Sequence, residues 1–111
     1  MATDSSLFSG SMTMLVLKLL SEKDMYGYEM IETLKQRSKN VFEMKAGTLY
    51  PLLHSLVEKK LLTTYEKEVN GKKRKYYGIT LIGKTVLKEK EKVWHEYSKA
   101  VISIIGEECY G

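Results

Sequence analysis

The sequence is poor in cysteine and proline, with one of each, Cys109 and Pro51. A single cysteine excludes an internal disulfide framework and fits a reducing compartment, so we expect a cytoplasmic protein. Scarce proline together with 43% hydrophobic residues is typical of a globular chain and not of a disordered one. At 111 residues, the chain is long enough for one such globular unit.

Long apolar runs are also missing. The run from Met12 to Leu20 is interrupted by Lys18, and it is far shorter than the ~20 residues that a membrane-spanning helix needs. The preceding segment, Met1 to Ser11, is polar and carries no positive charge, so it does not have the pattern of a signal peptide. We therefore expect no membrane insertion.

Patterns that support catalysis or metal binding are absent from the sequence. His54 and His95 lie far apart, and with Cys109 they form no cluster with metal-ligand spacing. The chain has no evident pair of nucleophile and base, no glycine-rich phosphate loop and no GxSxG motif. We therefore expect a protein that is not an enzyme and that holds neither a metal nor another cofactor.

The positive charge is unevenly distributed along the chain. The net charge is +4, but residues 81–111 hold five lysines and five glutamates, so the whole surplus lies in residues 1–80. A local excess of this kind suits a polyanionic partner, and it leaves the C-terminal part electrostatically neutral.

Thr63 to Thr80 is the most informative segment, and it predicts a basic β-hairpin. Two β-prone runs flank Asn70-Gly71, which suits the positive φ values of a type I′ turn. That turn would place Glu68 opposite Lys73, Glu66 opposite Lys75 and Tyr65 opposite Tyr76. Cross-strand pairing does not neutralise all of the positive charge, because residues 66–75 hold five cations and two anions. The surplus near the tip is suited to nucleic-acid phosphates.

Apolar periodicity predicts helices over about 11–21, 26–37, 46–60 and 81–105, with the hairpin before the last. The fold class is therefore mainly α with a small β-hairpin. We also expect a short strand at Val41-Phe42. Pro51 allows two versions of the third helix, one capped by Thr48 and one that begins near Ala46 and bends slightly. In both, the N-terminal end of this helix is exposed beside Lys45.

The last predicted helix has an apolar stripe wider than one domain usually buries. At ~25 residues it is ~37 Å long, which exceeds the ~28 Å diameter expected of the preceding body. Its excess apolar face needs a partner, so we predict a dimerisation helix in residues 81–111 and a DNA-binding domain in residues 1–80. The predicted dimer contacts are Val86, Val93, Tyr97, Val101 and Ile104.

Three helices, a basic hairpin and a long terminal helix are the order of a winged helix-turn-helix. Three motifs in that order resemble the PadR family of transcriptional regulators, in its short-tailed branch, from about Gly10 to Ile105. They are Tyr26-Gly27-Tyr28-Glu29, Gly47-Thr48-Leu49-Tyr50-Pro51-Leu52, and Arg74-Lys75-Tyr76-Tyr77 followed by Ile79-Thr80 and Gly83. Lys59-Lys60 departs from the family pattern, in which an acidic residue and a glycine often close the third helix.

The resemblance implies a homodimeric transcription factor, usually a repressor, that binds inverted-repeat operators in double-stranded DNA. The third helix would enter the major groove and the hairpin would follow the flanking backbone or minor groove. His54 and Thr48 are the residues suited to reading base edges. The full set of predicted DNA contacts is Tyr28, Lys45, Thr48, Tyr50, Pro51, His54, Lys72, Lys73, Arg74 and Lys75.

Trp94, the one tryptophan, lies on the predicted dimer stripe. In some PadR-like regulators a tryptophan at the matching position lines a pore between subunits that takes flat aromatic compounds, so the resemblance implies a small aromatic effector. The alternative is that Trp94 simply fills the dimer core. Two other functions also remain open, namely a winged-helix module that binds an acidic protein without binding an operator, and a binder of single strands or RNA.

Overall fold

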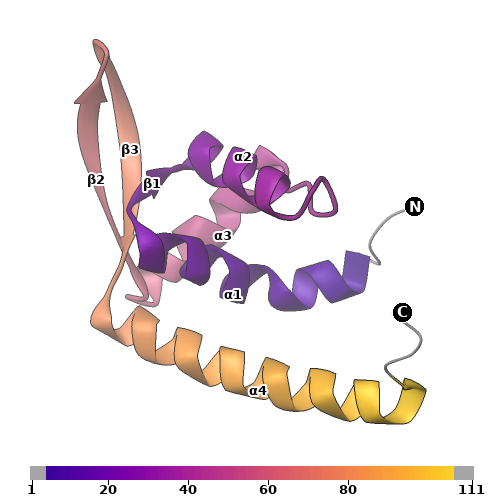
Figure 1. Cartoon of the computed structure of the whole chain (residues 1–111). Helices are drawn as coiled ribbons and strands as arrows, with labels where there is room; N and C mark the ends of the chain where they lie inside the picture. Colours follow the sequence, from indigo (N-terminus) through magenta and orange to yellow (C-terminus); the bar gives the residue numbers. More distant parts are fainter. Residues whose placement is uncertain (1–4, 107–111) are drawn as a thin grey trace.

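The computed structural model describes residues 5–106, with side chains from Ser11 onward. The residues 107–111, with Cys109, lie outside this range. The predicted order of three helices, hairpin and long helix is confirmed (Figure 1). The elements are α1 (Ser5–Glu22), β1 (Met25–Tyr26), α2 (Gly27–Arg37), α3 (Ala46–Glu58), β2 (Leu62–Val69), β3 (Lys72–Ile79) and α4 (Leu81–Ile105).

Two predicted elements differ from the structure. Helix α1 begins at Ser5, well before the predicted Ser11. The prediction missed its first turns because serines and Gly10 dominate them, and these residues are weak helix formers. The predicted strand at Val41-Phe42 is wrong. That segment is a loop in which the Phe42 amide donates to Ser38 Oγ at 2.9 Å. The additional strand is β1, which is too short to have a periodicity of its own and pairs with β3 in the sheet order β1-β3-β2.

The core lies between α1, α2, α3 and the base of the hairpin. Apolar residues three and four positions apart give each helix one apolar side, and these sides meet in a core in which Leu17, Leu49 and Leu53 are fully buried. Tyr77 of β3 adds an aromatic ring to this core with 5% of its surface exposed. The packing leaves the opposite side of α3 facing solvent.

The hairpin, which we call the wing (residues 62–79), has the predicted register. Asn70 and Gly71 take φ values of 51° and 80°, as a type I′ turn requires. Glu66 lies opposite Lys75, Glu68 opposite Lys73 and Tyr65 opposite Tyr76. Figure 1 shows the wing projecting away from the helices. Its tip is therefore held only through its base.

Helix α3 begins at Ala46 and not at the later position that a Thr48 cap would give. The amides of Thr48 and Leu49 both donate to the Lys45 carbonyl at 2.9 Å, so Thr48 lies inside the helix. Pro51 is consequently an interior residue, where its ring cannot donate to the Gly47 carbonyl.

The C-terminal end of α3 holds Lys60 in a backbone conformation that usually favours glycine. Lys60 has φ of 65°, its amide donates to the Val57 carbonyl, and the Leu61 amide donates to the Leu56 carbonyl, both at 2.9 Å. These two bonds form a Schellman motif, in which glycine is favoured because a side chain disfavours the left-handed backbone. The helix thus ends at Glu58, with Lys60 in a strained conformation.

We predict that Lys60→Gly stabilises the protein. Removing the side chain relieves a conformational cost of ~1 kcal/mol, which corresponds to a rise in melting temperature of about 5 °C for a chain of this size. Differential scanning calorimetry measures the change. The matched control is Lys59→Gly at a right-handed position, where glycine lowers the melting temperature. Equal destabilisation by both variants would contradict the strained left-handed conformation of Lys60.

Helix α4 spans Leu81–Ile105 as predicted, and its start is tied to the end of α3. Thr80 Oγ1 accepts a hydrogen bond from the Gly83 amide at 3.0 Å and donates to the Lys60 carbonyl at 2.8 Å. Gly83 packs so closely on the Leu61 carbonyl that a side chain there would clash with this backbone oxygen. The helix therefore leaves the wing in a fixed direction and runs beside α1 (Figure 1).

Candidate nucleic-acid interface

Helix α3 has one fully buried face and one exposed face. Leu49, Leu53 and Leu56 are at most 2% exposed. The predicted recognition residues lie on the exposed side of this helix or at its N-terminal edge, namely Lys45, Thr48, Tyr50, Pro51 and His54. The structure therefore brings all five onto one accessible surface, from which side chains can reach into a groove of DNA.

Two tyrosines extend this surface towards α2. Tyr28 is 60% exposed at the start of α2, and Tyr50 lies with its hydroxyl against Gly27, where a side chain would clash with it. Partial burial, and then the neighbouring Tyr28, raise the pKa of Tyr50 above its ordinary value. The Tyr50 hydroxyl is protonated at neutral pH, as for any tyrosine of ordinary or raised pKa, and it can donate to a phosphate.

The cations of the wing are divided between its two faces. Side chains alternate along a strand, so the register places Lys73 and Lys75 on the same face as their opposing partners Glu68 and Glu66. The other face carries Lys67, Lys72 and Arg74 without an acidic residue from either wing strand. The charge surplus of three thus lies on one face. Charge counting gives the size of the surplus, and the hairpin register, which the sequence also predicted, places it on this face.

The charged face of the wing contacts aromatic rings at its base. The Arg74 guanidinium carbon lies 4.4 Å from the ring centroid of Tyr26, and Lys67 Nζ lies 5.3 Å from that of Tyr76. Tyr26, half-buried, comes from β1 and not from the wing itself. Lys67 and Tyr26 were not among the predicted DNA contacts. The predicted register already places Lys67 opposite Arg74, whereas the position of Tyr26 depends on the pairing of β1 with β3, which the sequence did not predict.

Helix α4 leaves part of its apolar stripe uncovered. Val93, Tyr97 and Ile104 are 64%, 56% and 84% exposed. Val86 differs from these three because it is half-buried against the chain's own core, and Val101 is also half-buried. The predicted dimer residues therefore divide into an exposed group near the middle and end of the helix and a group that already has neighbours in its own chain.

Sequence comparison places the chain in a known family. The model of the transcriptional regulator PadR-like family matches residues 16–89. That match covers the last part of α1, all of α2 and α3, the wing and the start of α4. This chain belongs to the PadR-like family.

Relatives and solved structures agree with this assignment. An uncharacterized protein of Lysinibacillus sphaericus is 38% identical over 98 residues, which cover 87% of this chain and 90% of the relative. A transcriptional regulator from Clostridium thermocellum is similar in structure, with a TM-score of 0.83 at 28% identity over 91% of this chain and 99% of that one. For a PadR-like transcriptional regulator from Bacillus cereus the TM-score is 0.82 at 31% identity, over 92% and 99%.

Membership in the PadR-like family makes the chain a DNA-binding transcriptional regulator with a winged helix fold. The exposed face of α3 and the basic wing are the two surfaces that this function requires. Among the residues that the structure describes, no three His, Cys, Asp or Glu side chains gather as a metal site. Within the same range, no helix has the length and apolar character needed to cross a membrane.

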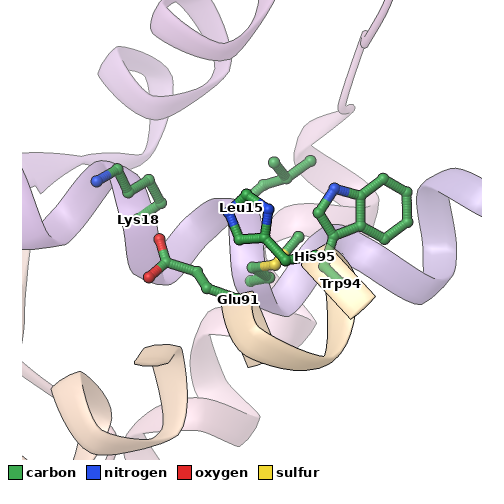
Figure 2. A pocket seen from close by; sticks show the side chains of 6 residues that line it. Leu15, Lys18, Glu91, Trp94 and His95 are labelled. Atoms are coloured by element: carbon green, nitrogen blue, oxygen red, sulfur yellow. The ribbon is translucent and has the colours of Figure 1, made fainter. Parts of the chain in front are cut away.

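Trp94 of this PadR-like chain lines a shallow groove between α4 and α1. The groove has a volume of about 170 Å³, and Met14, Leu15, Lys18, Glu91 and His95 complete its lining. In Figure 2, Lys18 and Glu91 lie at one end and Trp94 at the other. The indole is 45% exposed and stacks on Tyr97, with ring centroids 5.9 Å apart. Trp94 therefore lies between the chain's own α1 and the uncovered stripe.

Proposed function

We propose that the chain is a homodimeric repressor that binds inverted-repeat operators in double-stranded DNA. Each subunit places α3 in the major groove of one half-site, and its wing follows the adjacent backbone. The observation that carries the proposal is the two-sided character of α3, with its leucines fully buried and its polar residues exposed. The wing surplus of three positive charges supports it, because cations that neutralise phosphates supply most of the affinity for DNA.

Dimerisation follows from the uncovered stripe of α4. Three large apolar side chains that are more than half exposed, Val93, Tyr97 and Ile104, lie on one side of a 25-residue helix. Exposed apolar surface of this kind usually marks an interface. A second copy supplies the same stripe, so two α4 helices cover one another and set two α3 helices on one duplex. A dimer bound at a promoter excludes RNA polymerase, and binding therefore represses.

The direct test of operator binding is a titration with duplexes from the chain's own locus. For a dimer that contacts ~6–10 phosphates, affinity falls ~10³–10⁵-fold between 50 and 200 mM salt. The bound sequence has half-sites ~34–36 Å apart, or a multiple of this distance. Equal affinity for the locus and for unrelated duplexes would contradict the proposal, and so would a preference for single strands.

We predict that His54→Ala changes the sequence preference of the protein. His54 is exposed on α3, and its ring nitrogens suit base edges, so its removal costs about 1–3 kcal/mol at one base-pair position of each half-site. Selection from a random duplex library measures this as reduced preference at that position. Lys73→Ala is the comparison, because losing a phosphate contact weakens all sequences alike. An unchanged preference in the His54 variant would contradict base reading.

The effector part of the proposal concerns the groove beside Trp94. We propose that a planar aromatic compound binds there and relieves repression, because the exposed indole offers a flat surface between α1 and α4. Addition of such compounds then quenches the fluorescence of Trp94 in a saturable manner. N-acetyltryptophanamide titrated with the same compounds is the control for inner-filter effects. Failure of saturable quenching across a broad panel would contradict the effector role.

A further inference from the structure

The base of the wing is tied to the corner between α1 and α2 by one acidic residue and three tyrosines. The Tyr65 hydroxyl donates to Asp24 Oδ2 at 2.6 Å. The Tyr76 ring stacks on Tyr65, with centroids 5.8 Å apart, and meets Tyr26 edge-on at 5.5 Å. These four residues, which we call the wing clamp, come from the α1–β1 loop, from β1 and from both strands of the wing.

The wing clamp supplements a very short backbone connection. Strand β1 pairs with β3 only at Met25↔Tyr77 and Tyr26↔Tyr76. The Asp24 carboxylate also packs over Gly78, where an added methyl carbon would lie 2.7 Å from Asp24 Oδ1. The Tyr65 hydroxyl is the donor in its hydrogen bond to Asp24, and this bond raises the pKa of the hydroxyl above its ordinary value.

We propose that Asp24 and Tyr65 are positioning residues for DNA binding, which fix the direction of the wing relative to α2 and α3. This inference rests on the proposed use of the wing and α3 on one duplex. An isolated two-stranded hairpin is at best marginally stable in water, and a mobile wing would have to be ordered at each binding event. A wing that is already ordered in the free protein loses less conformational entropy when DNA binds.

The clamp also limits the motion of one cation. The Arg74 guanidinium lies over the Tyr26 ring, and Arg74 is half-buried, whereas Lys72, Lys73 and Lys75 are exposed. Ordering a long side chain before binding reduces the entropy lost on binding. The position of Arg74 is therefore better defined than those of Lys72, Lys73 and Lys75, which remain free to adapt to the DNA backbone.

Because Asp24 is negatively charged, the proposal can be tested by whether replacing it tightens or weakens DNA binding. A carboxylate at the base of a basic wing repels phosphates, so its removal should tighten DNA binding if electrostatics alone acted. Removal of a positioning residue weakens operator binding instead. Glu66 is the matched control, because it is an exposed carboxylate in the wing outside the clamp.

The experiment compares Tyr65→Phe, Asp24→Ala and Glu66→Ala in the full-length protein. We expect operator affinity to fall roughly five- to tenfold for Tyr65→Phe and for Asp24→Ala, since each loses one hydrogen bond. We expect Glu66→Ala to bind more tightly than the parent. The double variant of Tyr65 and Asp24 should lose little beyond either single variant, because both remove the same bond.

A measurement without DNA separates the clamp from general stability. In the free protein, the ¹⁵N order parameter of Gly71 should decrease in Tyr65→Phe, while those of the α3 amides remain unchanged. Operator binding by Asp24→Ala that is as tight as that of Glu66→Ala would overturn the proposal. An unaltered order parameter at Gly71 would also overturn it. Failure of the parent protein to bind any operator would instead contradict the proposed function, and the Gly71 measurement would still test the clamp.

Discussion

Operator binding should largely be lost when Lys72, Lys73 and Arg74 are replaced together by alanine. A dimer then lacks six cations, so the slope of log affinity against log salt concentration becomes shallower by about 5, and affinity at 0.15 M salt falls about 10³–10⁴-fold. Unrelated duplexes should weaken by a similar factor, because phosphate contacts carry no sequence information. Fluorescence anisotropy at several salt concentrations measures both quantities.

The control for this triple variant removes three cations elsewhere. Lys88, Lys92 and Lys99 are exposed on α4, and their replacement by alanine lowers the net charge by the same amount. We expect this control to bind the operator within a few-fold of the parent, since long-range attraction is screened beyond ~8 Å at this ionic strength. Equal binding by the wing variant and the parent would show that the wing is not a DNA contact.

The second large effect is expected from Val93→Glu combined with Ile104→Glu. Both side chains are more than half exposed in the single chain, so the variant keeps its own fold. In a dimer each glutamate would be buried against the partner helix without a counter-charge, which is costly. We expect a monomer at micromolar concentration, and operator affinity lower by about 10²–10⁴-fold because the two half-sites are no longer linked.

Thr85→Glu with Ser103→Glu is the matched control for the dimer variant. These two positions are exposed on α4 outside the apolar stripe, and they add the same negative charge. Light scattering should report a dimer for this control and a monomer for the stripe variant. A stripe variant that stays dimeric would place the interface elsewhere.

Local sequence signals predicted the parts of this structure that depend on near neighbours. Asn70-Gly71 determined the turn, and the turn determined the whole register of the wing. The long apolar stripe from Leu81 predicted α4 with both ends at the observed residues. The exposed face of α3 could also be predicted, because helical periodicity separates the leucine face from the face of His54.

Contacts between residues far apart in the chain were not predictable in this way. Asp24 and Tyr65 are 41 positions apart, and neither residue suggests the other without the fold. Strand β1 forms only because the edge of β3 is beside it. The left-handed Lys60 is a further case, since lysine does not favour that conformation and the hydrogen bonds of the Schellman motif impose it.

The sequence also could not show which apolar residues of α4 pack against the chain's own core and which stay exposed for a partner. Leu87 is 6% exposed in the core, whereas Val93 is 64% exposed, although both belong to the same stripe. The division depends on where α1 lies. Because α1 begins at Ser5, it runs beside much of α4, and the predicted overhang of this helix is reduced (Figure 1). The division into residues 1–80 and 81–111 stays a prediction.

Sedimentation equilibrium of the protein alone and with its operator duplex tests the central claim most directly. At micromolar concentration the account predicts a mass of two chains without DNA, and two chains on one duplex that contains both half-sites. A single chain in solution that leaves duplexes from its own locus unbound would contradict the account.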